Sequence, residues 1–181
     1  MKKYSRLLAL LVMGQMGYTA QSDVIKFVDP NLEQAVRDAL EIPAGQPITK
    51  ADMARLTDLD ASNRGIQNLS GLEYAINLQG LDLSFNQISD ISPLANLTNL
   101  QFLHLLSNQI SNISPLANLT NLQYLLLDSN QISDISPLIS NTGLGQGDEV
   151  YLQNNPLDLT PGSDDMQNIQ ILQSRGVIVY Y

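Results

Sequence analysis

Leucine and isoleucine recur along the middle of the chain in a pattern that repeats every 22 residues. The segment that begins at Leu78 is followed in register by segments that begin at Leu100 and Leu122. Within each segment a Leu-x-Leu stretch alternates apolar and polar positions, which predicts a short strand whose leucines point into the core. An Ile-x-x-Ile-x-x-Leu stretch follows, and its spacing near three residues predicts a 3₁₀ or extended return. Each segment is therefore expected to form one coil.

An asparagine follows each predicted strand at the same position of the repeat. A buried asparagine amide can satisfy backbone groups of its own coil and of the adjacent coil, so these residues are expected to form a ladder between coils. Arg64 takes this position in an irregular first coil. A period of 20 to 29 residues with this pattern is typical of leucine-rich repeats. The predicted ladder residues are Asn86, Asn108, Asn130 and, after a three-residue break in register, Asn155.

One coil cannot bury its apolar side chains alone, so the pattern predicts a stack of coils. We expect an α/β fold: a right-handed leucine-rich-repeat solenoid with a parallel β-sheet on the concave face and short 3₁₀ or extended returns on the convex face. About five coils, the first and last of them irregular, are expected over residues 56–160.

The open ends of such a stack need covers. We expect a helical N-terminal cap over residues 23–55, because Asp29-Pro30 is a helix start and Thr49 with Asp52 resembles a capping box. A helix followed by a strand-like tail is expected to cap the C-terminal end over residues 161–181.

The first residues have the order of an export signal, with three basic residues before an apolar run over 7–13. That run is too short to cross a bilayer. We predict a signal peptide over residues 1–22, because cleavage after Ser22 follows small residues whereas cleavage after Ala20 would put the bulky Tyr18 in the recognition pocket. The alternative is an apolar segment that stays in the fold.

The remaining chain is strongly acidic, with 18 acidic and six basic side chains. This balance argues against binding to nucleic acid or to anionic lipid. The chain has no cysteine, which excludes disulfides and a lipidated cysteine anchor. Beyond the leader no apolar stretch is long enough for membrane insertion, and no C-terminal anchoring signal is visible. We expect a monomer that is secreted or held in the cell envelope, in a periplasm or at the surface.

Three stretches carry a resemblance to a known family: Asp-Pro-Asn-Leu-Glu-Gln-Ala-Val-Arg at 29–37, Leu-Asp-Ala-Ser-Asn-Arg-Gly-Ile at 59–66, and Asn-Gln-Ile-Ser-Asp-Ile-Ser-Pro-Leu at 86–94. Over residues 23–160 the chain resembles bacterial internalin-like leucine-rich-repeat proteins. The resemblance implies a helical N-terminal cap, a shallow right-handed solenoid, export, and protein binding through the concave sheet.

The outward positions of the predicted strands differ from coil to coil. The first strands present aspartates, and the later ones present aromatic and aliphatic side chains. An exposed cluster of this kind commonly marks an interface, and the aspartates would favour basic groups on the partner. The alternative is that these side chains only pack against their lateral neighbours. The predicted binding residues are Phe102, His104, Leu106, Tyr124, Leu126, Tyr151, Asp82 and Asp128.

Catalytic and metal chemistry finds little support in the sequence. His104 is the only histidine and there is no cysteine, so neither a zinc site nor a nucleophilic pair is expected. Asp58, Asp60 and Asp82 offer oxygen ligands for calcium but lack the spacing of a dedicated loop. We expect no enzyme activity, no metal and no cofactor.

The leading hypothesis is an exported module that recognises a protein or peptide partner through its concave sheet. A structural envelope or matrix protein that self-associates is one alternative. A secreted effector or enzyme inhibitor is another.

Overall fold

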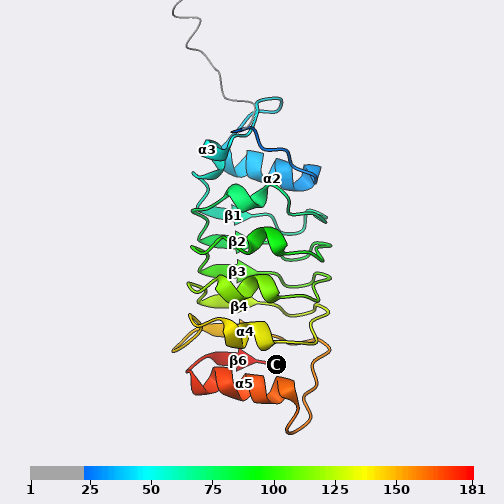
Figure 1. Cartoon of the computed structure of the whole chain (residues 1–181). Coiled ribbons are helices and arrows are strands. Elements are labelled where there is room, and N and C mark those ends of the chain that lie inside the picture. Colours follow the sequence, from blue (N-terminus) through cyan, green and yellow to red (C-terminus); the bar gives the residue numbers. More distant parts are fainter. Residues whose placement is uncertain (1–22) are drawn as a thin grey trace, which may run out of the picture.

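The computed structural model describes residues 23–181, in which the chain forms one stack of coils with a helix at each end (Figure 1). The predicted signal peptide lies outside the described residues. The leucine-rich-repeat solenoid expected from the repeat is confirmed. None of the helices within residues 23–181 has the length and apolar character needed to cross a membrane.

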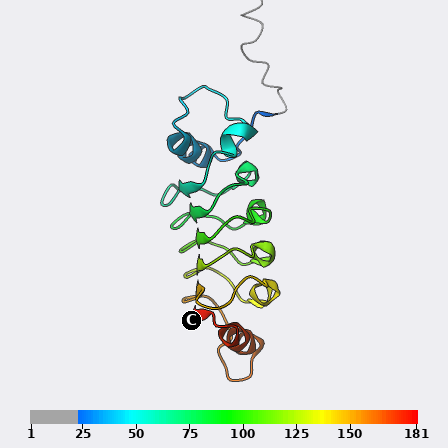
Figure 2. The same ribbon diagram turned by 90° about the vertical axis from the view of Figure 1, so that its left-hand side faces the viewer.

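Six short parallel strands form a single sheet along one side of the stack (Figure 2). They pair in sequence order, so each strand contacts only the strands of the preceding and following coils. The middle residue of each strand is buried and the two flanking residues point outward, as the alternating pattern predicts. The strands are β1 (Asp58–Asp60), β2 (Gly80–Asp82), β3 (Phe102–His104), β4 (Tyr124–Leu126), β5 (Glu149–Tyr151) and β6 (Ile178–Tyr180).

The returns lie on the opposite side of the stack from the strands (Figure 2). Three of them are 3₁₀ helices: η2 (Leu72–Tyr74), η3 (Ser92–Leu94) and η4 (Ser114–Asn118). The fourth return, α4 (Ser136–Ser140), is a single α-helical turn. Its neighbour in the stack is the C-terminal helix, and Arg175, directly after the end of that helix, donates hydrogen bonds to the carbonyl oxygens of Ile139 and Asn141, at 2.9 and 3.2 Å. This return therefore packs against a cap on one side instead of against another repeat.

The N-terminal cap consists of α2 (Pro30–Leu40) and α3 (Lys50–Met53). The Asp29 carboxylate caps α2 by accepting hydrogen bonds from the N–H groups of Asn31 and Leu32, and it also accepts from Gln67 and Asn68 of the first coil. Burial opposes ionisation of Asp29, but these four N–H groups outweigh it and lower its pKa. The same carboxylate thus starts the helix and fastens it to the solenoid.

Two further features complete the caps. Thr49 and Asp52 form the reciprocal hydrogen bonds of a capping box at the start of α3, as expected. At the other end α5 (Asp164–Ser174) is capped by Ser163, and β6 follows it. The helix and strand expected at the C-terminus are therefore present, and β6 also extends the sheet by one strand.

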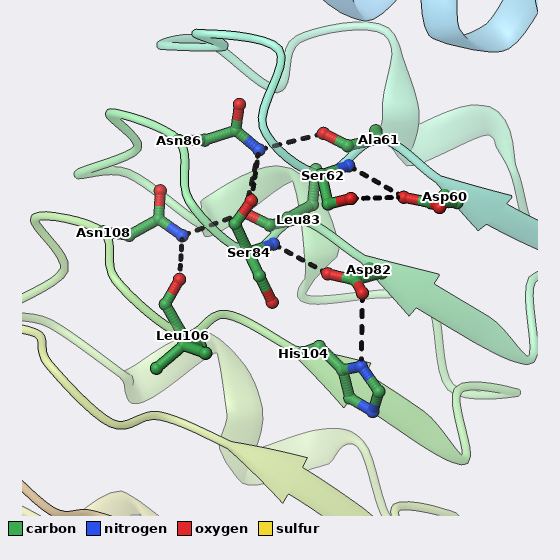
Figure 3. A network of polar contacts seen from close by, with 10 residues as sticks. All are labelled: Asp60, Ala61, Ser62, Asp82, Leu83, Ser84, Asn86, His104, Leu106 and Asn108. Atoms are coloured by element: carbon green, nitrogen blue, oxygen red, sulfur yellow. Dashed lines mark hydrogen bonds and ion pairs between the residues drawn. The ribbon is translucent and has the colours of Figure 1, made fainter.

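The asparagine side chains form a ladder of buried hydrogen bonds between coils (Figure 3). In a typical rung, Asn108 Oδ1 accepts from the N–H of Ile88 at 3.0 Å, while its Nδ2 donates to the carbonyl oxygens of Leu83 and Leu105 at 3.0 and 3.1 Å. Equivalent bonds are made by Asn86, Asn130 and Asn155.

The first coil ends the ladder differently. The backbone N–H of Arg64 donates to Asn86 Oδ1 at 3.1 Å, and the Arg64 guanidinium forms an ion pair with Asp38 of α2 at 2.7 Å. The departure from asparagine at this position therefore coincides with a contact to the N-terminal cap. Because the ladder and the caps hold successive coils in register, the outward strand residues are carried at fixed positions on one surface.

Candidate binding surface

The outward residues of the six strands line up in two columns, because the strands pair in register. We call the surface that these two columns form the sheet face. The first column is Asp58, Gly80, Phe102, Tyr124, Glu149 and Ile178. The second column is Asp60, Asp82, His104, Leu126, Tyr151 and Tyr180.

The part of the sheet face over β1 to β3 is acidic and hollowed. A hollow of about 260 Å³ opens there. We call it the acidic hollow. It is lined above the strand backbones by Asp58, Asp60, Gly80, Asp82, Phe102 and His104.

Two of its carboxylates are held by short local hydrogen bonds (Figure 3). Asp60 Oδ1 accepts from the hydroxyl and the N–H of Ser62, at 2.7 and 3.0 Å, and these bonds lower the pKa of Asp60. Asp82 Oδ1 accepts from the N–H of Ser84 at 2.8 Å, and Asp82 Oδ2 lies 3.4 Å from His104 Nδ1. These contacts fix the directions in which the carboxylates point.

The part of the sheet face over β3 to β6 carries a row of rings, three from the second column and Tyr124 from the first, which we call the aromatic row: His104, Tyr124, Tyr151 and Tyr180. Successive ring centroids lie 5.5, 5.3 and 4.3 Å apart. The last pair is stacked, with 18° between the ring planes. The Tyr151 hydroxyl donates to Glu149 at 2.6 Å, and this bond raises the pKa of Tyr151. Tyr180 is exposed, and the other three residues of the aromatic row are half-buried.

Most of the predicted binding residues lie together on or beside the sheet face. Phe102 is 47% exposed, whereas His104, Tyr124, Leu126, Tyr151 and Asp82 are half-buried. Leu106 is also half-buried and follows the end of β3.

The placement of Asp128 among the exposed binding residues is wrong. Only 8% of Asp128 is exposed, and its Oδ1 accepts a hydrogen bond from the N–H of Gln153 in the next coil at 2.9 Å. Burial raises the pKa of Asp128, against the lowering effect of this bond. Asp128 therefore joins two coils and does not contribute to an exposed surface.

Two exposed aromatic residues were missed from the sequence. Tyr180 joins the aromatic row through β6, although the strand-like tail was expected only as part of a cap. Phe85 is 56% exposed and has a φ of 58°. Ser107 and Ser129 adopt the same left-handed backbone at the equivalent positions, so the repeat imposes this conformation even on a bulky side chain. Phe85 lies 22 residues before Ser107 and 44 before Ser129, so its place in the repeat could have indicated from the sequence that its side chain is exposed.

Comparison with known proteins agrees with this architecture. The family model for leucine-rich repeats (two copies) matches residues 76–118 and 98–140. The crystal structure of an internalin, InlF, from Listeria monocytogenes superposes with a TM-score of 0.68 at 30% sequence identity. The match covers 79% of this chain and 50% of InlF, so the chain spans half the length of that protein.

A second internalin from Listeria monocytogenes, InlC2, is 32% identical over 84% of this chain and 83% of its own length. Its TM-score is 0.45, so this superposition adds nothing to the structural comparison. Among curated proteins no sequence match was found.

The fold and the repeat match define the class of protein as a leucine-rich-repeat solenoid. Within that class, the chain belongs to the bacterial internalin-like leucine-rich-repeat proteins.

Proposed function

We propose that the protein is an exported binding module that recognises a protein or peptide partner through the sheet face. The observation that carries this proposal is Phe102, a phenylalanine that is 47% exposed in the middle of the sheet, between the acidic hollow and the aromatic row. Large apolar side chains on a rigid surface, flanked by polar groups, are the usual anchors of protein interfaces.

The charge of the chain supports a partner with basic groups. Residues 23–181 hold 18 acidic and six basic side chains. The two columns of the sheet face contain four carboxylates and no lysine or arginine: Asp58, Asp60, Asp82 and Glu149. A cationic partner would be attracted to this surface, and the attraction would weaken as salt is added.

Export is part of the proposal and is supported by the basic and apolar residues at the start of the sequence. The protein recovered from the extracellular or envelope fraction should have the mass of a chain whose first residue is Asp23. Recovery of the uncleaved chain from the cytoplasm alone would contradict export.

The binding proposal is tested by replacing Phe102 and Tyr124 together with alanine. The double variant should melt within a few degrees of the wild type, because both side chains point away from the core, and it should lose a partner captured by the wild type from extracellular fractions. The matched control replaces Ile76 and Leu159, which are exposed at 55% and 45% and lie outside the sheet face, and should retain the partner. Equal capture by the double variant and the wild type would show that the partner binds elsewhere. Static light scattering on the same samples separates partner binding from self-association.

A further inference from the structure

The acidic hollow exists because one residue of the first column has no side chain. Gly80 lies between Asp58 of β1 and Phe102 of β3 in that column. A Cβ atom at position 80 would lie only 2.6 Å from Asp58 Oδ1. The Asp58 carboxylate therefore leans over Gly80, toward the hollow, in space that any other residue at position 80 would restrict.

The hollow offers hydrogen-bond acceptors that the described part of the chain leaves unused. Within residues 23–181 neither oxygen of Asp58 accepts a hydrogen bond, and Asp60 uses only Oδ1, toward Ser62. Asp82 Oδ2 has only the long contact with His104. Carboxylate oxygens at one side of a hollow are thus available to a donor that enters it.

The opposite wall of the hollow is the Phe102 side chain. The rings of the aromatic row contact one another, but within residues 23–181 the Phe102 ring makes no such pair. With 47% of the residue exposed, the ring is open to a cation. A guanidinium or ammonium group is attracted to the face of an aromatic ring, and the planar guanidinium can also stack on it.

Five of the six basic side chains within residues 23–181 have contacts elsewhere, and the sixth, Lys26, is an exposed residue of the N-terminal cap. Arg37, Arg55 and Arg64 pair with acidic residues of the N-terminal cap, and Lys50 lies over the Tyr74 ring. Arg175 donates to carbonyl oxygens beside α4. Because no lysine or arginine lines the acidic hollow, we expect the complementary positive charge to come from the partner.

We propose that the acidic hollow binds an arginine side chain of an extended segment of the partner, with the guanidinium stacked on Phe102 and hydrogen-bonded by Asp58 and Asp60. This assignment rests on the proposed function and specifies what the partner must present. Arginine fits better than lysine, because a planar group with five donors can stack and bind two carboxylates at once, whereas an ammonium acts as a point charge. The rest of the segment lies along the aromatic row.

The test is an NMR titration of the ¹⁵N-labelled protein with three acetylated, amidated peptides: Gly-Arg-Gly, Gly-Lys-Gly, and the same peptide with citrulline, which is close to arginine in shape but uncharged. The arginine peptide should shift the Gly80 and Phe102 amide signals in a saturable way. Its affinity should exceed that of the citrulline peptide by about tenfold or more, as expected for loss of charge-assisted hydrogen bonds. Equal binding of the lysine or the citrulline peptide would overturn the assignment to arginine.

Gly80→Ala is the sharpest variant, because its methyl group displaces the Asp58 carboxylate from its place beside the hollow without removing any charge. The backbone at Gly80 is not left-handed and the contacted atom is the end of a flexible carboxylate, so the fold should be retained. Gly145→Ala is the matched control, since a Cβ atom there meets only ordinary contacts at 3.8 Å. Gly80→Ala should lower affinity for the arginine peptide by about tenfold or more, and Gly145→Ala should leave it unchanged. Unchanged affinity in Gly80→Ala would exclude the hollow as the site.

The proposed function and the arginine site fail in different ways. If capture of the partner is lost in Tyr124→Ala but retained in Gly80→Ala, the sheet face binds a partner without an arginine in the hollow. If the arginine peptide binds the hollow but the double variant of Phe102 and Tyr124 still captures the partner, the hollow is a cation site and the proposed function is wrong.

Discussion

The two sides of each strand follow opposite rules. The inward residues of β1 to β4 are all leucine and are at most 3% exposed. The outward residues of the same strands include aspartate, glycine, phenylalanine, histidine, tyrosine and leucine. Each inward side chain packs against copies of itself in the adjacent coils, so one shape must serve in every coil. The outward side chains have no such constraint. Because they differ from coil to coil, they are available for recognition.

The ladder position extends this comparison to polar residues. Its asparagines are as uniform as the inward leucines, because each satisfies the same backbone groups of two coils. A polar side chain in this protein can therefore be structural or exposed for binding. The distinction depends on whether the side chain forms hydrogen bonds with buried backbone groups, and three comparisons of variants test it.

Asn108→Ala should have the largest effect on stability. It removes one acceptor and two donors from the buried backbone groups of Ile88, Leu83 and Leu105. At about 1–2 kcal/mol for each group left without a partner, the free energy of unfolding should fall by about 3–6 kcal/mol in urea denaturation. Asn96→Ala, an exposed asparagine one coil earlier, should change it by less than about 0.5 kcal/mol. Similar losses in both variants would show that the ladder bonds contribute no more than surface contacts.

Leu103→Ala and Phe102→Ala compare the two sides of a single strand. Leu103 is fully buried, so its truncation should leave a cavity and cost about 2–5 kcal/mol in the same denaturation experiment. Phe102 is 47% exposed, and its truncation should change stability by about 0.5 kcal/mol or less. A loss in Phe102→Ala comparable to that in Leu103→Ala would mean that the phenyl ring is a structural residue, and the proposed binding role would lose its main support.

Most of the fold could be predicted because the same 22-residue pattern occurs in several successive coils. The strand, the asparagine and the return recur at the same spacing. The coils that follow therefore establish the pattern even though Arg64 replaces the asparagine in the first coil. The helix starts at Asp29 and Thr49 are local patterns, and they also could be predicted.

The features that sequence reasoning missed depend on neighbours at irregular spacing. Tyr180 reaches the aromatic row only because β6 pairs with β5 across an intervening helix. Asp128 is buried, as is Ser84 at the equivalent position two coils earlier, whereas Leu106 between them is half-buried, so burial at this position does not follow from the repeat alone. The acidic hollow depends on where the Asp58 carboxylate leans, which no column of residue names shows.

Asp128→Asn should have the smallest effect on stability. Its sign tests whether the charge of this buried carboxylate stabilises or destabilises the fold. Asparagine keeps an acceptor for the N–H of Gln153 but carries no charge to bury. Because the pKa of Asp128 is raised above 3.8 in the folded protein, the folded state binds the proton more tightly than the unfolded chain. The contribution of Asp128 to the unfolding free energy therefore rises as pH falls from neutral through the folded pKa, and it levels off below 3.8. Asp128→Asn should be slightly more stable than the wild type at pH 7, by a small fraction of the Leu103→Ala loss, and the difference should close toward pH 4 in parallel urea denaturations. If Asp128→Asn were instead less stable at pH 7, the charge itself would be stabilising, and the hydrogen bond from Gln153 would outweigh the cost of burying the carboxylate.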